Sequence, residues 1–386
     1  MKRYRILIAA VAMTMCLGAT YSWSVYVPVL RELTGLSQGP VQLPFSLFYF
    51  AFPLTTILSG TLLSRLGPRL CAVAGGVAFG GGWMLASLGG RHFSFTVIGI
   101  GLLAGIGVGF AYIVPIATCI QWFPRHRGLV TGVAVAGFGG GAALVSQAAG
   151  YGMNTLGLTP FAVFGRLGFA FLILVTLAGL FMERPDPKPG SRRRVARLPL
   201  SGFLGRKVFW VLYGAMFTGL AAGFAVNANL RDLVPGSGLR TGVIAVSLFA
   251  VANALGRVLW GALFDRVASG LAIRANLLCQ AAVFLCGPWI LKSEPGLIAF
   301  AFLSGLNYGG VLVVYASSSA RIWGNESVGQ VYGWLFSANV PAALAPLLAG
   351  LVYDHVGDFT VSLGVFGLLL LAAGLWAGRA RGLLDT

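Results

Sequence analysis

The chain has 386 residues, of which 57% are hydrophobic and only 10% are charged, and its mean hydropathy is +0.85. Soluble domains carry about 25% charged residues. The composition therefore excludes a water-soluble globular protein and predicts an integral membrane protein. The formal net charge of +17 raises nucleic-acid binding as an alternative, which depends on where the charges lie along the chain.

Twelve apolar runs are each long enough to cross about 30 Å of hydrocarbon. They predict an all-α integral membrane protein with transmembrane helices at residues 6–30, 42–64, 70–89, 95–121, 128–150, 160–182, 208–230, 241–264, 271–291, 296–319, 328–351 and 360–378. The first run resembles a signal peptide, but it exceeds the about 7–15 apolar residues of a signal-peptide core and no clear cleavage site follows it. We therefore predict that it is a retained helix.

The basic residues are distributed unequally between the two sides of the predicted membrane helices. Of 27 Lys and Arg, one lies inside a span, and the loops on one side hold Arg31, Arg91, Arg166, Arg231, Arg240 and Lys292. All the others fall on the side of the termini. By the positive-inside rule, both termini are cytoplasmic in a multi-pass protein of the cell membrane, the inner or plasma membrane. This distribution also argues against nucleic acid as a partner.

Within the fourth run, Gly101, Gly105 and Gly109 follow a spacing that suggests either a nucleotide loop or close helix packing. No strand precedes them, so packing is the better interpretation. The chain also lacks a P-loop motif, which argues against ATP-driven transport. Five cysteines fall inside spans without metal or disulfide spacing, so we expect neither a metal nor a cofactor.

Residues 183–207 form the longest polar segment, with eight Lys and Arg among several prolines. This segment predicts three parts: a six-helix half at 1–182, a basic cytoplasmic linker at 183–207, and a second six-helix half at 208–386. The basic tract is either a solvated linker that follows the topology rule or a site for anionic lipid or a regulator.

The two predicted halves repeat one another at an offset of about 200 residues. Residues 60–66 return at 261–267, and residues 30–33 return at 230–233. Because each half has an even number of spans, the halves share one orientation and form a parallel repeat about an axis along the membrane normal.

The loop that begins at Gly60 and its repeat at Gly261 resemble the signature of the major facilitator superfamily. Ser64 stands where an acid is usual in that family, whereas Asp265 keeps it in the second copy. The resemblance implies that spans 1, 4, 7 and 10 line a central cavity. Spans 2, 5, 8 and 11 would flank it, and the remaining four would support it.

A narrower resemblance covers residues 122–137, which are similar to the monocarboxylate porter signature except that Trp122 replaces the usual tyrosine. It implies a secondary active transporter of small monocarboxylates, such as lactate or pyruvate, that works by rocker-switch alternating access with proton symport. Carboxylate exchange of the oxalate/formate type and a non-transporting carboxylate sensor stay open as alternatives.

Arg257 is the one charged residue inside a predicted span, where a charge costs roughly 2.5–3.5 kcal/mol. No acid lies in any predicted span to neutralise it. A planar guanidinium can hold a carboxylate through two parallel hydrogen bonds, so Arg257 is the candidate anion anchor. The alternative is that its side chain extends toward the membrane surface without a ligand.

Other polar residues on the spans complete the candidate site, either as substrate ligands or through packing and interhelical hydrogen bonds. Asn253 shares the helix face of Arg257, because the two are four residues apart. The remaining candidates are Tyr308, Asn227, Tyr112, Asn307, Tyr21, Asn339 and Ser337. Asn229 is a further polar residue of span 7.

The resemblance also implies roles for these positions. Arg257 corresponds to the cation that binds carboxylate in monocarboxylate and oxalate porters, whereas Asn253 stands where some family members carry an acid. Oxalate porters add a second cation on span 11, but residues 327–351 contain no Lys or Arg, which favours a monoanion. With no acid in the spans, exchange stays open beside proton symport.

The expected partners are a monocarboxylate anion, a proton and the lipid bilayer, and no obligate protein partner is evident. The spans contain no nucleophile with a base and no His/acid metal cluster, so the sequence does not predict an enzyme.

Overall fold

The computed structural model describes residues 2–123, 127–185, 199–234, 236–324 and 328–384. In these residues, twelve helical spans are long and apolar enough to cross a membrane, which confirms the predicted number. The protein is therefore an all-helical, multi-pass membrane protein.

The first six spans are built from ten helical segments, because some spans change helix type along their length. They are α1 (Lys2–Leu17) with η1 (Gly18–Val25), α3 (Gln38–Val41) with α4 (Leu43–Leu66), α5 (Pro68–Ala86) with η2 (Ser87–Gly90), the fourth span α6 (Ser94–Thr96), η3 (Val97–Ala104), α7 (Gly105–Ala111) and α8 (Ile113–Trp122), then α9 (Arg127–Asn154) and α10 (Pro160–Leu180). "First half" below means these six spans.

The last six spans, called the second half below, follow the same order. They are α12 (Lys207–Asn229) with η4 (Leu230–Leu233), α13 (Leu239–Phe264), α14 (Ser269–Ile290), α15 (Glu294–Trp323), the eleventh span α16 (Val328–Phe336), α17 (Asn339–Ala342) and α18 (Ala345–Val356), and α19 (Thr360–Arg379). Three short helices lie outside the spans: α2 (Val27–Thr34), α11 (Ser201–Leu204) and α20 (Arg381–Leu384).

The first span is shorter than the sequence predicted at its far end. It stops at Val25, and residues 27–34 form the separate helix α2, which has Pro28 in its first turn and ends at Gly35. Gly35 has a φ of 68°, a conformation that glycine adopts without steric cost. A proline and a left-handed glycine therefore set this boundary, which hydropathy alone does not show.

Glycine allows the first-half helices to approach one another closely. Glycines of the fourth span face the second span: a Cβ at Gly101 would meet Leu47, and one at Gly105 would meet the backbone of Phe48. A Cβ at Gly109 would collide with Thr55. The glycine run is therefore a packing surface, as small residues commonly are between membrane helices.

The two signature loops are held by different contacts. In the first half, the carboxylate of Glu183 lies 3.6 Å from both Lys2 Nζ and an Arg69 terminal nitrogen. In the second half, Arg321 donates to the carbonyl oxygens of Phe264 at 3.0 Å and Val267 at 2.9 Å. An acid from the start of the linker thus serves the first loop.

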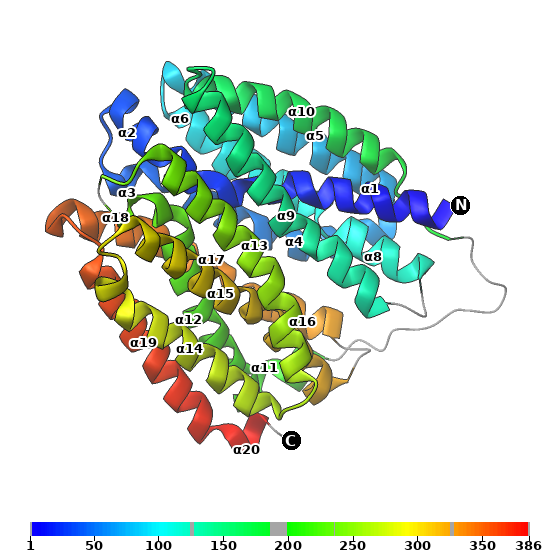
Figure 1. The fold of residues 1–386 in the computed structure, drawn as a ribbon. Helices are drawn as coiled ribbons and strands as arrows, with labels where there is room; N and C mark the ends of the chain where they lie inside the picture. Colours follow the sequence, from blue (N-terminus) through cyan, green and yellow to red (C-terminus); the bar gives the residue numbers. More distant parts are fainter. Residues whose placement is uncertain (1, 124–126, 186–198, 235, 325–327, 385–386) are drawn as a thin grey trace.

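The halves meet along three pairs of spans. Helix α9 packs on α13, helix α4 packs on α17 and α18, and η1 packs on α12 and α13. In Figure 1 the first half occupies the upper part of the view, and the halves join around α2, α3 and α18, at the end opposite the marked termini. We call this end the distal end.

Three predictions fall partly or wholly outside the described residues. These are residues 124–126 of the porter signature, residues 186–198 of the linker, and the Asn325–Ser327 loop. The division into parts at 1–182, 183–207 and 208–386 stays a prediction.

Candidate functional site

Side chains from seven spans surround a small cavity at the centre of the molecule. The free space for the centre of a water molecule is about 10 Å³, roughly enough for one water. Its lining consists of Tyr21, Tyr49, Phe52, Tyr112, Phe138, Arg257, Tyr308, Leu312, Phe336 and Asn339. The cavity is therefore almost closed by aromatic rings, with one charged side chain in its wall.

Arg257 projects into this cavity from the middle of α13 and is half-buried. Its Nε donates to Asn253 Oδ1, and one terminal nitrogen donates to the carbonyl oxygen of Val135, both at 3.4 Å. Both distances exceed the usual 2.7–3.2 Å, and they use two of the five N–H donors of a guanidinium. Within the described residues, no carboxylate forms a salt bridge with Arg257.

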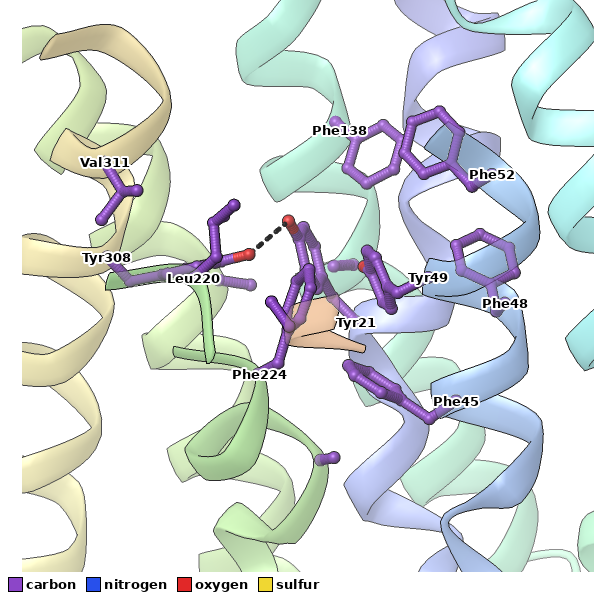
Figure 2. Close-up of a cluster of buried hydrophobic side chains, with 14 of the residues drawn as sticks. Tyr21, Phe45, Phe48, Tyr49, Phe52, Phe138, Leu220, Phe224, Tyr308 and Val311 are labelled. Atoms are coloured by element: carbon purple, nitrogen blue, oxygen red, sulfur yellow. Dashed lines mark hydrogen bonds between the residues drawn. The ribbon is translucent and has the colours of Figure 1, made fainter. Parts of the chain in front are cut away.

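Three of the predicted tyrosines are brought together here. The hydroxyls of Tyr21 and Tyr308 lie 3.3 Å apart and join the two halves, as the dashed line in Figure 2 shows. The Tyr308 ring stacks on Phe249, with ring centroids 5.9 Å apart. Tyr112 packs edge-on against Phe138 at 5.6 Å.

The predicted asparagines divide between the cavity and other places. Asn339 lines the cavity and donates through Nδ2 to the carbonyl oxygen of Phe336 at 2.7 Å. Asn253 is buried behind Arg257, and its Nδ2 has no partner among the described residues. Asn227 is fully buried, and neither amide atom has a described partner, but it does not line the cavity.

Two predicted residues point away from the cavity. Asn307 lies in a lateral groove between α13, α14 and α15. Its Nδ2 donates to the carbonyl oxygen of Leu303 at 2.9 Å. Ser337 donates to the carbonyl oxygen of Trp334 at 2.6 Å, on its own helix.

The sequence did not single out four aromatic lining residues and one aliphatic one: Tyr49, Phe52, Phe138, Phe336 and Leu312. A signal for the first two exists. Phe45, Phe48, Tyr49 and Phe52 are spaced three or four residues apart, which places them on one helical face. Figure 2 shows this aromatic face of α4 directed toward Tyr21 and Phe224.

A second polar cluster joins the halves nearer the distal end, and we name it the distal latch. It consists of Gln38, Gln42, Asn229, Asp232 and Asp354. Asn229 Oδ1 accepts from Gln38 Nε2 at 2.7 Å and from Gln42 Nε2 at 2.9 Å. Gln38 Nε2 also donates to Asp232 Oδ2 at 3.1 Å, and Gln42 Nε2 donates to the carbonyl oxygen of Ala228 at 3.1 Å.

Asp354 fastens the latch from the second half. Its two carboxylate oxygens accept from the backbone N–H groups of Gln38 at 2.7 Å and Gly39 at 2.8 Å, at the start of α3. These N–H groups have no partner within their own helix, so a carboxylate there is stabilising. Asn229, a polar residue of span 7, therefore belongs to this latch.

A family model described as "Major Facilitator Superfamily" matches residues 8–339. The chain is 26% identical to the oxalate:formate antiporter of Oxalobacter formigenes over 363 residues, covering 88% of this chain and 82% of that protein. It is 25% identical to monocarboxylate transporter 10 of Danio rerio, covering 86% and 67%, and 25% identical to apicoplast pyruvate carrier 1 of Toxoplasma gondii, covering 74% and 64%.

Solved structures share the fold. A D-xylose–proton symporter matches with a TM-score of 0.73 at 17% identity, covering 97% of both chains. The transporter FucP in the outward conformation matches with a TM-score of 0.65 at 16% identity, covering 99% of both chains.

Proposed function

Since the chain belongs to the major facilitator superfamily and is a secondary transporter rather than an enzyme, we propose that it carries small monocarboxylates of the lactate or pyruvate type. The observation that carries this proposal is Arg257, a cation in the wall of a central cavity without an acidic partner among the described residues.

The chemistry of Arg257 supports a carboxylate as the substrate. Its planar fork can hold both carboxylate oxygens through parallel N–H···O bonds, which a single ammonium group matches less well. Its present contacts at 3.4 Å are long and leave terminal N–H groups for a ligand. Three relatives with names that refer to oxalate, formate, pyruvate or monocarboxylates are compatible with this class.

The charge of the cavity wall supports a monoanion. Arg257 is the one ionised side chain in the lining, and the eleventh span contributes the neutral residues Phe336 and Asn339. One positive charge balances lactate or pyruvate, whereas a dianion would leave one charge uncompensated in a low-dielectric site, which is costly.

The arrangement across the halves supports alternating access. Arg257 belongs to the second half, whereas Tyr21 and Tyr112 belong to the first. A substrate held from both sides would favour the closed form, because a ligand shifts an equilibrium toward the state that it binds better. The Tyr21–Tyr308 contact at 3.3 Å would have to separate for the cavity to open.

We propose that transport is proton symport, with both termini cytoplasmic and the distal end facing outward. Carboxylate exchange is the second candidate, because no acid lines the cavity and the anchor's neighbour Asn253 is an amide, which does not titrate. A membrane carboxylate sensor that binds without transport is a third alternative.

Uptake of labelled L-lactate into proteoliposomes, with and without an inward proton gradient, tests the proposal. The parent protein is compared with Arg257→Gln and with Arg240→Gln, which removes an exposed cation outside the cavity. Gradient-driven uptake that Arg257→Gln abolishes and Arg240→Gln retains supports the proposal. Uptake only into vesicles preloaded with another carboxylate would favour exchange, binding without uptake would favour the sensor, and equal uptake by Arg257→Gln would refute the anchor.

A further inference from the structure

Tyr49 has an environment that packing alone does not explain. Its ring lies in the aromatic cluster of Figure 2, with ring centroids 4.3 Å from Phe224, 4.7 Å from Phe45 and 5.0 Å from Phe48. The side chain is 2% exposed. A phenylalanine would make the same ring contacts without a polar atom, so the ring environment gives no reason for a hydroxyl.

The Tyr49 hydroxyl has no hydrogen-bond partner among the described residues. Buried polar groups are almost always paired, because leaving one unpaired forfeits the hydrogen bonds that it made to water. Tyr26 and Tyr315 are the other described tyrosines with buried, unpartnered hydroxyls, and neither lines the cavity. Tyr49 does line the cavity, so a ligand there could satisfy its hydroxyl.

Other donors around the cavity are already engaged. The Tyr21 and Tyr308 hydroxyls contact each other at 3.3 Å. Asn339 Nδ2 donates to a carbonyl of its own helix at 2.7 Å, and Tyr332 donates to the carbonyl oxygen of Leu312 at 3.0 Å. Tyr49 therefore combines a position in the wall with an uncommitted donor.

Arg257 and Tyr49 lie on opposite halves and offer different chemistry to a ligand. The guanidinium matches a carboxylate, whereas a phenolic O–H donates one hydrogen bond to a neutral oxygen and can accept one from a hydroxyl. Lactate and pyruvate both carry an oxygen on C2, next to the carboxylate. Propionate has the same chain length and charge but has no such oxygen.

We infer that Tyr49 is a further substrate-binding residue that donates to the C2 oxygen, so that the transporter selects short 2-hydroxy and 2-oxo monocarboxylates over unsubstituted ones. This inference rests on the proposed function and narrows its substrate class. It also assigns a second contact between the substrate and the first half.

The test compares Tyr49→Phe with Tyr315→Phe, which removes an equally buried and unpartnered hydroxyl away from the cavity. Uptake of labelled L-lactate, pyruvate and propionate is measured for the parent and both variants over a range of concentrations. Thermal unfolding of each purified protein checks that the variants fold.

We expect Tyr49→Phe to raise the half-saturating concentration for L-lactate and pyruvate about ten-fold, the size of effect typical for one lost hydrogen bond. The value for propionate and all values for Tyr315→Phe should stay at parent levels. Tyr49→Phe should unfold at the same temperature as the parent or higher, because its hydroxyl has no partner within the protein.

Two results would overturn the inference while leaving the proposed function standing. One is a Tyr49→Phe variant that handles all three acids as the parent does. The other is an equal loss for all three acids, which would assign Tyr49 to packing. A parent protein that carries none of the three acids would instead overturn the proposed function, and this inference with it.

Discussion

The distal latch and the central cavity lie between the same two halves, yet their polar groups are satisfied to different degrees. In the latch, the side-chain amides of Gln38 and Gln42 each donate to two acceptors, and Asp354 accepts two backbone N–H groups. In the cavity, Tyr49 has no described partner, and Arg257 makes two contacts of 3.4 Å.

This difference separates two functions of buried polar groups. Groups that satisfy each other across an interface hold it closed, whereas groups that stay unsatisfied in a closed cavity are available to a ligand. The latch therefore stabilises a conformation, and the cavity provides recognition. The variants below test this distinction, in order of expected effect.

Asp354→Ala should have the largest effect on the latch. Hydrogen bonds to a charged group contribute about 1.5–3 kcal/mol each, so losing two should lower the closed fraction at the distal end at least about ten-fold. Spin labels on cysteines introduced at the exposed positions Leu33 and Val356, in a cysteine-free background, report the distance across this end. Asp358→Asn is a matched control, because Asp358 Oδ1 accepts from Thr360 within the second half. An unchanged distance distribution in Asp354→Ala would refute the latch.

Asn253→Ala should weaken substrate binding moderately, because it removes the acceptor that orients Arg257 Nε. One such bond corresponds to about a 3- to 10-fold rise in the half-saturating concentration for lactate. Asn253→Asp should be at least as harmful, since a carboxylate one turn from Arg257 would compete with the substrate. Concentration-dependent lactate uptake checks both variants, and a gain of affinity in Asn253→Asp would contradict this role.

Asn227→Leu asks whether every unsatisfied buried polar group serves a ligand. Asn227 is fully buried, both amide atoms lack described partners, and it lies outside the cavity lining. A leucine of similar size should raise the free energy of unfolding by about 1–3 kcal/mol, because no unpaired amide is buried. Thermal unfolding measures this, and lactate uptake should change less than two-fold. Loss of uptake in a stable variant would return Asn227 to the binding site.

Ser337→Ala should have the smallest effect. The hydroxyl donates to the carbonyl oxygen of Trp334 and lies away from the cavity. Its removal should change unfolding by less than about 0.5 kcal/mol, as expected away from special contacts. Parallel unfolding and uptake measurements would expose any larger effect, which would mean that span 11 turns this face toward the substrate in another state.

The sequence predicted the twelve spans because hydropathy and length follow directly from the thickness of a bilayer. It also identified Arg257, since an unpaired charge in an apolar run stands out without any three-dimensional information. Three tyrosines of the cavity wall were predicted from their positions on the spans expected to line it.

The sequence did not separate Asn307 from Tyr308. They are adjacent on α15 and therefore point about 100° apart, and only the rotation of that helix directs Tyr308 into the cavity and Asn307 toward the lateral groove. The latch was missed for a different reason. Gln38 and Asn229 are 191 residues apart, and their contact depends on how the halves pack. Tyr49 was overlooked because an aromatic stripe on a membrane helix is more typical of packing.

The central claim is that Arg257 binds the carboxylate, and equilibrium binding of labelled L-lactate to the purified protein tests it without requiring transport. Removing one partner of a buried charge pair typically costs about 2–5 kcal/mol, so Arg257→Gln should bind at least about 30-fold more weakly than the parent. Arg257→Lys should fall between the two, because it keeps the charge and loses the fork. Parent-like lactate binding by a folded Arg257→Gln protein would contradict the account.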